Sequence, residues 1–204
     1  MKKFLLFLIL IPLIGCDDPL IGKKKSKAAK FSKSSIIEFR ENTILLADGY
    51  SKTSPDEFKK RLDSLDKPKF RNIALEELQK IEDKKVEFQI FVDDKNVENY
   101  VFIYECIYYQ LDEQRAAIVV DVLSKELKDE SSKQEVRFKR IHGRFFFTPT
   151  SKIVKLKYLK AHKKNKKYET EYIVAHKTGG IGLLVSNIKN VDFEKSIKRL
   201  LAAN

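Results

Sequence analysis

The sequence predicts an α+β fold: a single domain in which an antiparallel β-meander sheet packs against helices. Strand-like segments follow one another between residues 136 and 186, joined by short links. Short links connect antiparallel neighbours rather than parallel strands. Four other segments carry apolar residues at three- and four-residue spacing, which is typical of helices that cover a sheet.

The globular part begins with two short strands, IIEFR and TILLA, closed by the turn pair Asp48-Gly49. A helix is expected next, because Ser54 can cap it, Pro55 suits its first position and Glu57 can complete a capping box. Its apolar stripe ends before Pro68, where we expect the helix to stop.

A second helix is predicted from about residue 73 to 83, with the pair Glu76-Glu77 on its polar side. Residues 86–92 and 98–108 are rich in β-branched and aromatic residues around the turn-prone DDKN, which predicts a hairpin. The longest helix follows over residues 110–129, and its apolar stripe needs a sheet to cover.

The sheet itself is predicted from strands at about 136–147, 152–161, 168–176 and 180–186. Alternation in the third strand places Glu169 and Glu171 on one face, where we expect exposed pairs with Lys155 or Lys157 of the neighbouring strand. A closing helix follows, capped by Asp192, and we expect it to cover the same face as the long helix.

The order of these elements resembles the PsbP-like family, an α/β sandwich that includes small exported bacterial lipoproteins. The similarity runs over residues 36–203, from the early turn ADGY through the meander to GIGLLVSN and DFEKSIKRLL. The family often has Pro and Trp at the early turn, where this sequence has Ala47 and Tyr50. The resemblance implies a non-catalytic accessory or binding role in the envelope, and it transfers no functional residues.

The N-terminus predicts export and lipidation. Two lysines precede an apolar run of eleven residues, which is shorter than the roughly 20 needed to span a bilayer and fits a signal peptide over residues 1–15. The stretch LIGC, which ends at Cys16, resembles the lipobox of bacterial lipoproteins, in which the cysteine thiol receives diacylglycerol and its amine an acyl group such as palmitate. Two or three acyl chains hold a protein firmly to a membrane.

The expected location is therefore the bacterial cell envelope, on the exported side of a membrane. Asp17 resembles an inner-membrane retention signal; where that sorting rule does not apply, the outer membrane is expected. Residues 16–35 read as a Lys- and Ser-rich flexible tether before the domain at 36–204, although its lysines would also tune orientation near an anionic leaflet.

The formal charge of +12 is concentrated in residues 133–168, which hold 13 Lys or Arg and one acidic residue. Such a segment is compatible with binding an anionic polymer or lipid headgroups. The alternative is a solvated basic face produced by a Lys-rich composition. The candidate anion-binding residues are Arg137, Arg140, Arg144, Lys155, Lys157, Lys160, Lys163, Lys164, Lys166 and Lys167.

Catalytic and metal motifs are absent from the sequence. His142, His162 and His176 have no metal-ligand spacing, and no GxSxG or phosphate-binding loop is present. The apolar neighbours of Cys106 indicate a buried, inert thiol. The glycines at 179, 180 and 182 read as a hairpin turn.

The sequence therefore predicts a lipid-anchored envelope lipoprotein with a non-catalytic binding or accessory role and no cofactor. Its expected partners are the membrane, through the anchor, and an envelope protein or anionic polymer. Nucleic acid is not expected, because an exported, anchored protein rarely meets it. The alternatives are an electrostatic binding module built on the basic segment and an unrecognised hydrolase.

Overall fold

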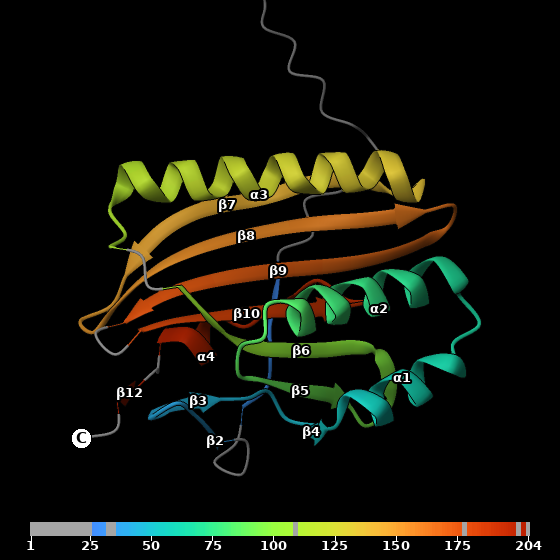
Figure 1. The fold of residues 1–204 in the computed structure, drawn as a ribbon, viewed down its shortest axis with the longest axis horizontal. Helices are drawn as coiled ribbons and strands as arrows, with labels where there is room; N and C mark the ends of the chain where they lie inside the picture. The colour runs from blue at the N-terminus through green and yellow to red at the C-terminus, as the bar shows by residue number, and fades with distance from the viewer. Residues whose placement is uncertain (1–25, 32–35, 108–109, 177–178, 199–200, 203–204) are drawn as a thin grey trace, which may run out of the picture.

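A seven-stranded antiparallel sheet forms the centre of the molecule, in the order β4-β5-β6-β10-β9-β8-β7 (Figure 1). The structure, a computed structural model, describes residues 26–31, 36–107, 110–176, 179–198 and 201–202, so the signal segment and Cys16 lie outside it. The predicted α+β class with a single domain is confirmed. The elements are β1 (Lys27–Ala28), β2 (Ile36–Phe39), β3 (Asn42–Leu45), β4 (Tyr50–Thr53), α1 (Pro55–Asp63), α2 (Pro68–Asp83), β5 (Phe88–Asp93), β6 (Asn96–Cys106), α3 (Glu113–Gln134), β7 (Arg137–Phe147), β8 (Ser151–His162), β9 (Asn165–His176), β10 (Gly179–Asn187), β11 (Val191–Asp192), α4 (Glu194–Lys198) and β12 (Leu201–Ala202).

Two antiparallel meanders build this sheet, β4 to β6 and β7 to β10, and they meet where β6 pairs with β10. The four predicted strands of the second meander and the predicted hairpin of the first are present. Strand β4 was not predicted, because YSKT is short, has one large apolar side chain, and forms a strand by pairing with the edge of β5.

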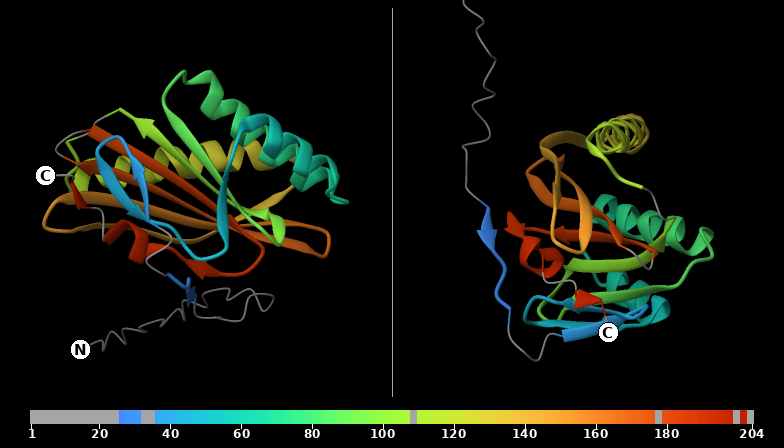
Figure 2. Two further views of the ribbon diagram at one scale, coloured as in Figure 1. Left: turned by 90° about the horizontal axis from the view of Figure 1, so that it is seen from below. Right: turned by 90° about the vertical axis from the view of Figure 1, so that its left-hand side faces the viewer.

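Both faces of the sheet are covered. On the face that we call the helix face, α1 and α2 pack over side chains such as Tyr100 and Phe102, and α3 packs over Val154 of β8. On the opposite face, which we call the hairpin face, the β2–β3 hairpin and α4 pack over Val101 and Leu183 (Figure 2). The expectation that α4 and the long helix cover the same face is therefore wrong. An apolar stripe predicts that a helix packs against the sheet, but it does not indicate which face of the sheet the helix covers.

The helix starts follow their capping chemistry. The Ser54 hydroxyl accepts a hydrogen bond from the Glu57 amide at 3.2 Å, and Pro55 occupies the first turn, as predicted. Helix α2 begins five residues earlier than predicted, at Pro68, which suits a first helical position. Helix α3 is capped by Asp112, whose carboxylate accepts from the Arg115 amide at 2.7 Å.

The sheet covers only one side of helix α3. It packs over β7 and β8, with Leu111 just before the helix and Ala116 within it fully buried. Two members of its predicted apolar stripe, Ile118 and Val122, are 58% and 49% exposed. The sheet therefore covers one flank of this helix and leaves the other flank facing α2.

The glycine-rich segment is not a hairpin turn throughout. Gly179 begins β10 with φ of +146°, but Gly180 and Gly182 lie inside that strand. A Cβ at position 182 would lie 2.2 Å from the ring of Tyr104 on β6. The absence of a side chain at Gly182 therefore makes room for Tyr104 on the helix face, where that ring forms part of the site described next.

Candidate functional site: a groove between two helices

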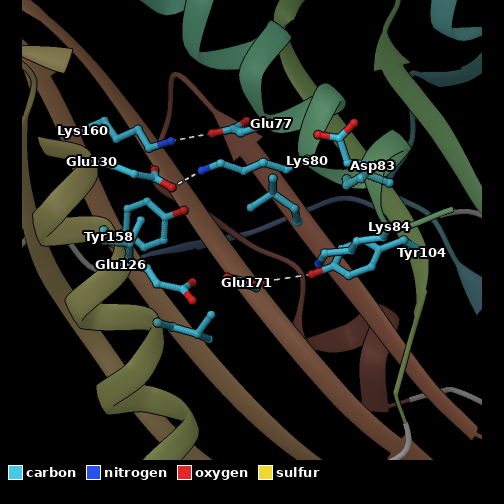
Figure 3. Close-up of a pocket in the computed structure, with 14 residues that line it drawn as sticks. Glu77, Lys80, Asp83, Lys84, Tyr104, Glu126, Glu130, Tyr158, Lys160 and Glu171 are labelled. Atoms are coloured by element: carbon cyan, nitrogen blue, oxygen red, sulfur yellow. Dashed lines mark hydrogen bonds and ion pairs between the residues drawn. The ribbon is translucent and has the colours of Figure 1, made fainter. Parts of the chain in front are cut away.

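Helices α2 and α3 form the walls of a groove on the helix face, and the sheet forms its floor (Figure 3). One end, which we call the polar end, encloses about 480 Å³. Its floor presents Tyr158 and Lys160 from β8 and Glu171 from β9. An ion pair between Lys80 of α2 and Glu130 of α3 joins the two walls (Figure 3).

The groove continues toward Cys106 as an apolar end of about 610 Å³. Ile107, Ile118 and Val122 line it, and these are three of the six large apolar side chains that are exposed among the described residues. Tyr104 and Glu171 border both ends, which makes the groove continuous. A concave apolar surface with a few polar groups is the usual form of a ligand site.

A buried ionic network underlies the polar end. The Tyr100 hydroxyl donates to Glu77 Oε2 at 2.5 Å, and the Tyr158 hydroxyl donates to Glu169 Oε2 at 2.8 Å. Lys160 Nζ lies 2.6 Å from Glu169 Oε2 and also pairs with Glu77. Each member is at most 8% exposed, and the full set is Glu77, Tyr100, Tyr158, Lys160, Lys167 and Glu169.

The pKa values of the two carboxyl groups of this network are shifted in opposite directions. Burial would raise the pKa of Glu77, but the ammonium groups of Lys160 and Lys167 outweigh it and lower that pKa to about 2. Burial, together with the negative charge of Glu77, raises the pKa of Glu169 to about 7. Most of the polar atoms bond to one another, so the network supports the groove rather than offering a free acid or base.

Glu171 is the carboxylate that faces the groove itself. It is partly exposed, and its Oε1 accepts a hydrogen bond from the Tyr104 hydroxyl at 2.9 Å. The Lys84 ammonium lies 4.7 Å from the centre of the Tyr104 ring. Burial raises the pKa of Glu171, and the carboxylate of Glu126 on α3 adds to that rise.

The predicted exposed pairs of Glu169 and Glu171 with Lys155 or Lys157 are wrong. Both glutamates point to the helix face, whereas the two lysines point to the hairpin face. Lys155 Nζ lies 2.6 Å from Asp192 and 2.7 Å from Glu194 at the start of α4.

Lys157 is held by backbone and hydroxyl oxygens. Its Nζ donates to the Val191 carbonyl at 2.8 Å and to the Ser26 hydroxyl at 3.2 Å. Burial lowers the pKa of Lys157 to about 8. Beside these contacts, Lys27 and Ala28 of the predicted tether pair with β11, so the chain enters the domain on the hairpin face.

The ten candidate anion-binding residues do not form one surface. Four of them are buried: Lys155, Lys157, Lys160 and Lys167. These four therefore belong neither to a solvated basic face nor to an exposed binding surface. Arg144 is half-buried and pairs with Glu194 at 2.6 Å. The remaining five are exposed, along edge strand β7 and at the β8–β9 turn: Arg137, Arg140, Lys163, Lys164 and Lys166.

Sequence reasoning missed the buried network because it placed Glu77 on the polar side of α2. Glu77 lies four residues after Ile73 and four before Ile81, on the buried stripe of that helix. That spacing was the available signal. Its neighbours in the network, Lys160 and Glu169, are distant in sequence, and no local sequence pattern predicts that they lie beside it.

The histidines and the cysteine lie apart from one another. His162 lies 3.2 Å from the Glu135 carbonyl, His176 is buried at the end of β9, and His142 is exposed on β7. Within the described ranges, no three His, Cys, Asp or Glu side chains are grouped as metal ligands. Burial raises the pKa of Cys106 to about 11, so this thiol is protonated at neutral pH.

No helix in the described part of the chain is both long and apolar enough to cross a membrane.

Neither a protein-family model nor a curated protein sequence matches this chain. The structure is similar to the solution structure of cyanobacterial PsbP (CyanoP) from Synechocystis sp. PCC 6803, with a TM-score of 0.48 and 11% sequence identity. The match covers 83% of this chain and 86% of that chain. This likeness is one of fold and transfers no functional residue.

Proposed function

We propose that this chain is a lipid-anchored envelope protein whose domain binds a ligand in the groove between α2 and α3 without catalysing a reaction. The observation that carries the proposal is the apolar end of the groove, where Ile107, Ile118 and Val122 are exposed together. Apolar side chains that gather in one concavity mark a binding site rather than the scattered apolar residues of an ordinary surface.

Binding without catalysis is supported by the chemistry of the groove lining. Cys106 is the one described lining residue that offers a thiol or aliphatic hydroxyl, and no histidine lines the groove beside it. Its raised pKa removes the thiolate that nucleophilic catalysis needs. The hydrolase alternative requires convergent groups that are free to react, and within the buried network Glu77 and Lys160 are bound to each other.

The anchor is proposed from the LIGC stretch and is tested by metabolic labelling with a palmitate analogue. The wild-type chain is expected to incorporate the label, and Cys16→Ala is expected to lose it. Equal labelling of the two chains would exclude Cys16 as the lipidation site.

The entry point of the chain supports an orientation for the domain. Ser26 contacts Lys157 on the hairpin face, and the groove opens on the helix face. The ten peptide units that link Cys16 to Ser26 span at most about 35 Å when extended. An anchored domain would therefore lie close to the membrane with the groove on the side away from the entry point.

The groove is tested with the neutral apolar dye Nile red and the full chain carrying Cys16→Ala, which removes lipids that would compete for the dye. Val122→Glu places a charge in the apolar end and is expected to weaken dye binding about tenfold. The matched control is Ile141→Glu on β7, since Ile141 is also exposed but lies outside the groove. Equal losses in both variants, or no dye binding at all, would contradict the proposal.

A second candidate function is binding of anionic lipid headgroups or polymer by the exposed part of the basic segment. The observation that favours it is the exposure of Arg137 and Arg140 on edge strand β7 and of Lys163, Lys164 and Lys166 at the β8–β9 turn. Retention on anionic liposomes should fall steeply as salt is raised. No retention at low ionic strength would end this candidate.

A further inference from the structure

We propose that the ligand of the groove is an amphipathic cation, with its apolar part against α3 and its ammonium group between Glu171 and Glu126. This inference rests on the groove being the binding site. It adds the chemical class of the ligand, which the shape of the groove alone does not specify.

The charge of the groove is opposite to that of the chain. The whole chain has a formal charge of +12, but the groove lining holds six acidic residues and three lysines. Each lysine already has a partner: Lys80 pairs with Glu130, Lys160 pairs with Glu77 and Glu169, and Lys84 lies over the Tyr104 ring. The groove lining therefore has a net negative charge, although the whole chain is basic, and this negative charge attracts a positively charged ligand group.

The position of that positive group follows from Glu171. Its Oε1 accepts from Tyr104, and no donor among the described residues bonds to its Oε2. Glu126 borders the same part of the groove from α3 (Figure 3), and its charge acts on Glu171. Two carboxylates that face one space repel each other, and a cation between them removes that repulsion.

The neighbouring aromatic ring suits a cation as well. The Lys84 ammonium already lies over the face of Tyr104, the ring whose hydroxyl bonds to Glu171. Together Glu126, Glu171 and Lys84 leave one negative charge uncompensated, and one ammonium group neutralises it. From this point the groove continues directly into the apolar end, so a single ligand reaches both.

The test compares three probes that share an octyl chain: octylammonium, octyl glucoside and octyl sulfate, each below its micelle concentration. Dissociation constants are measured by calorimetry on the full chain with Cys16→Ala. Octylammonium is expected to bind about tenfold more tightly than octyl glucoside, because its charge adds a charge-assisted hydrogen bond. Octyl sulfate is expected to bind most weakly.

Variants locate the ammonium group. Glu171→Gln is expected to abolish the preference for octylammonium over octyl glucoside. Glu126 is exposed on α3, so Glu126→Gln does not threaten folding and is expected to weaken octylammonium binding about threefold. The control Glu113→Gln makes the same change of charge on α3 outside the groove and should leave all three affinities unchanged.

The outcomes separate this inference from the function on which it rests. If all three probes bind equally and Val122→Glu abolishes binding, the groove is a binding site but the preference for a cation is wrong. If Glu113→Gln weakens octylammonium as much as Glu126→Gln does, the attraction is a general effect of charge and the site is wrong. If none of the probes binds, the proposed function fails together with the inference.

Discussion

Glu77 and Glu169 show how two buried carboxyl groups come to have different roles at the residue scale. Glu77 pairs with Lys160 and accepts from Tyr100, and its lowered pKa keeps it ionised. Glu169 lies beside that negative charge with a raised pKa, and its Oε1 has no hydrogen-bond donor. The network therefore depends on an ionised Glu77 more than on an ionised Glu169.

This difference predicts unequal costs for two matched substitutions. Glu77→Gln leaves Lys160 short of a buried counter-charge, and removing one partner of a buried pair costs about 3–5 kcal/mol of unfolding free energy. Glu169→Gln resembles the protonated carboxyl and is expected to cost about 1 kcal/mol near pH 6. Urea unfolding of the two variants measures both values. Equal losses would contradict the division of roles.

The same pair predicts a pH dependence with a definite sign. The raised pKa of Glu169 means that its contribution to stability is full below its ordinary pKa of 4.5 and is lost as pH rises through about 7. Glu77 contributes above pH 4.5, and that contribution is lost as pH falls through about 2. Between pH 4.5 and 8, the wild-type chain should therefore lose up to about 3 kcal/mol relative to Glu169→Gln. Urea midpoints of both chains across that range test this, and parallel curves would contradict it.

At the scale of elements, strand β10 can pair closely with β6 because Gly182 lies opposite Tyr104. The register pairs Gly182 with Tyr104, and the ring occupies the space that a Cβ would need. Glycine in the middle of a strand is ordinarily a weakness, and such a position often marks a close approach of this kind.

This packing predicts strong coupling between the two residues. Gly182→Ala is expected to cost about 3 kcal/mol, because the ring must leave its place on the strand. In the background of Tyr104→Ala, the same substitution should cost less than about 1 kcal/mol. Unfolding free energies of the two single variants and the double variant complete the cycle. Additive costs would show that the ring does not require the glycine.

The elements also show what the sequence can and cannot predict. The meander and the cap of α1 were predictable, because alternation, short links and capping residues act locally. The burial of Lys155, Lys157 and Lys160 was not, because the run KLKYLK mixes charged and apolar residues as an exposed strand does. Their burial follows from partners on α2 and near α4, which are distant in sequence.

The same limit explains the groove. The apolar spacing of α3 correctly predicts a helix but places Ile118 and Val122 on its buried stripe. In the structure the sheet covers the other flank, and α2 stands apart from α3 across the groove. How far apart two helices stand on a sheet is set by the whole assembly, and the groove is therefore visible only in three dimensions.

At the scale of the whole molecule, the charge of the chain is distributed between structure and surface. Buried lysines of the basic segment hold α2 and the start of α4 to the sheet, and five of the ten candidate anion-binding residues remain exposed on β7 and the β8–β9 turn. The chain enters on the hairpin face, while the acidic groove opens on the helix face. The proposed attachment and the proposed ligand site therefore lie on different faces of the sheet.

Methyl NMR of the full chain carrying Cys16→Ala, titrated with octyl glucoside, tests the binding groove most directly. The methyl signals of Ile118, Val119 and Val122 on α3 should shift progressively with ligand concentration, because these side chains line the apolar end. The signals of Val174 and Leu183 on the hairpin face should remain in place, because the sheet separates them from the groove. Shifts confined to the hairpin face, or no shifts in the α3 methyl groups at saturation, would contradict the account.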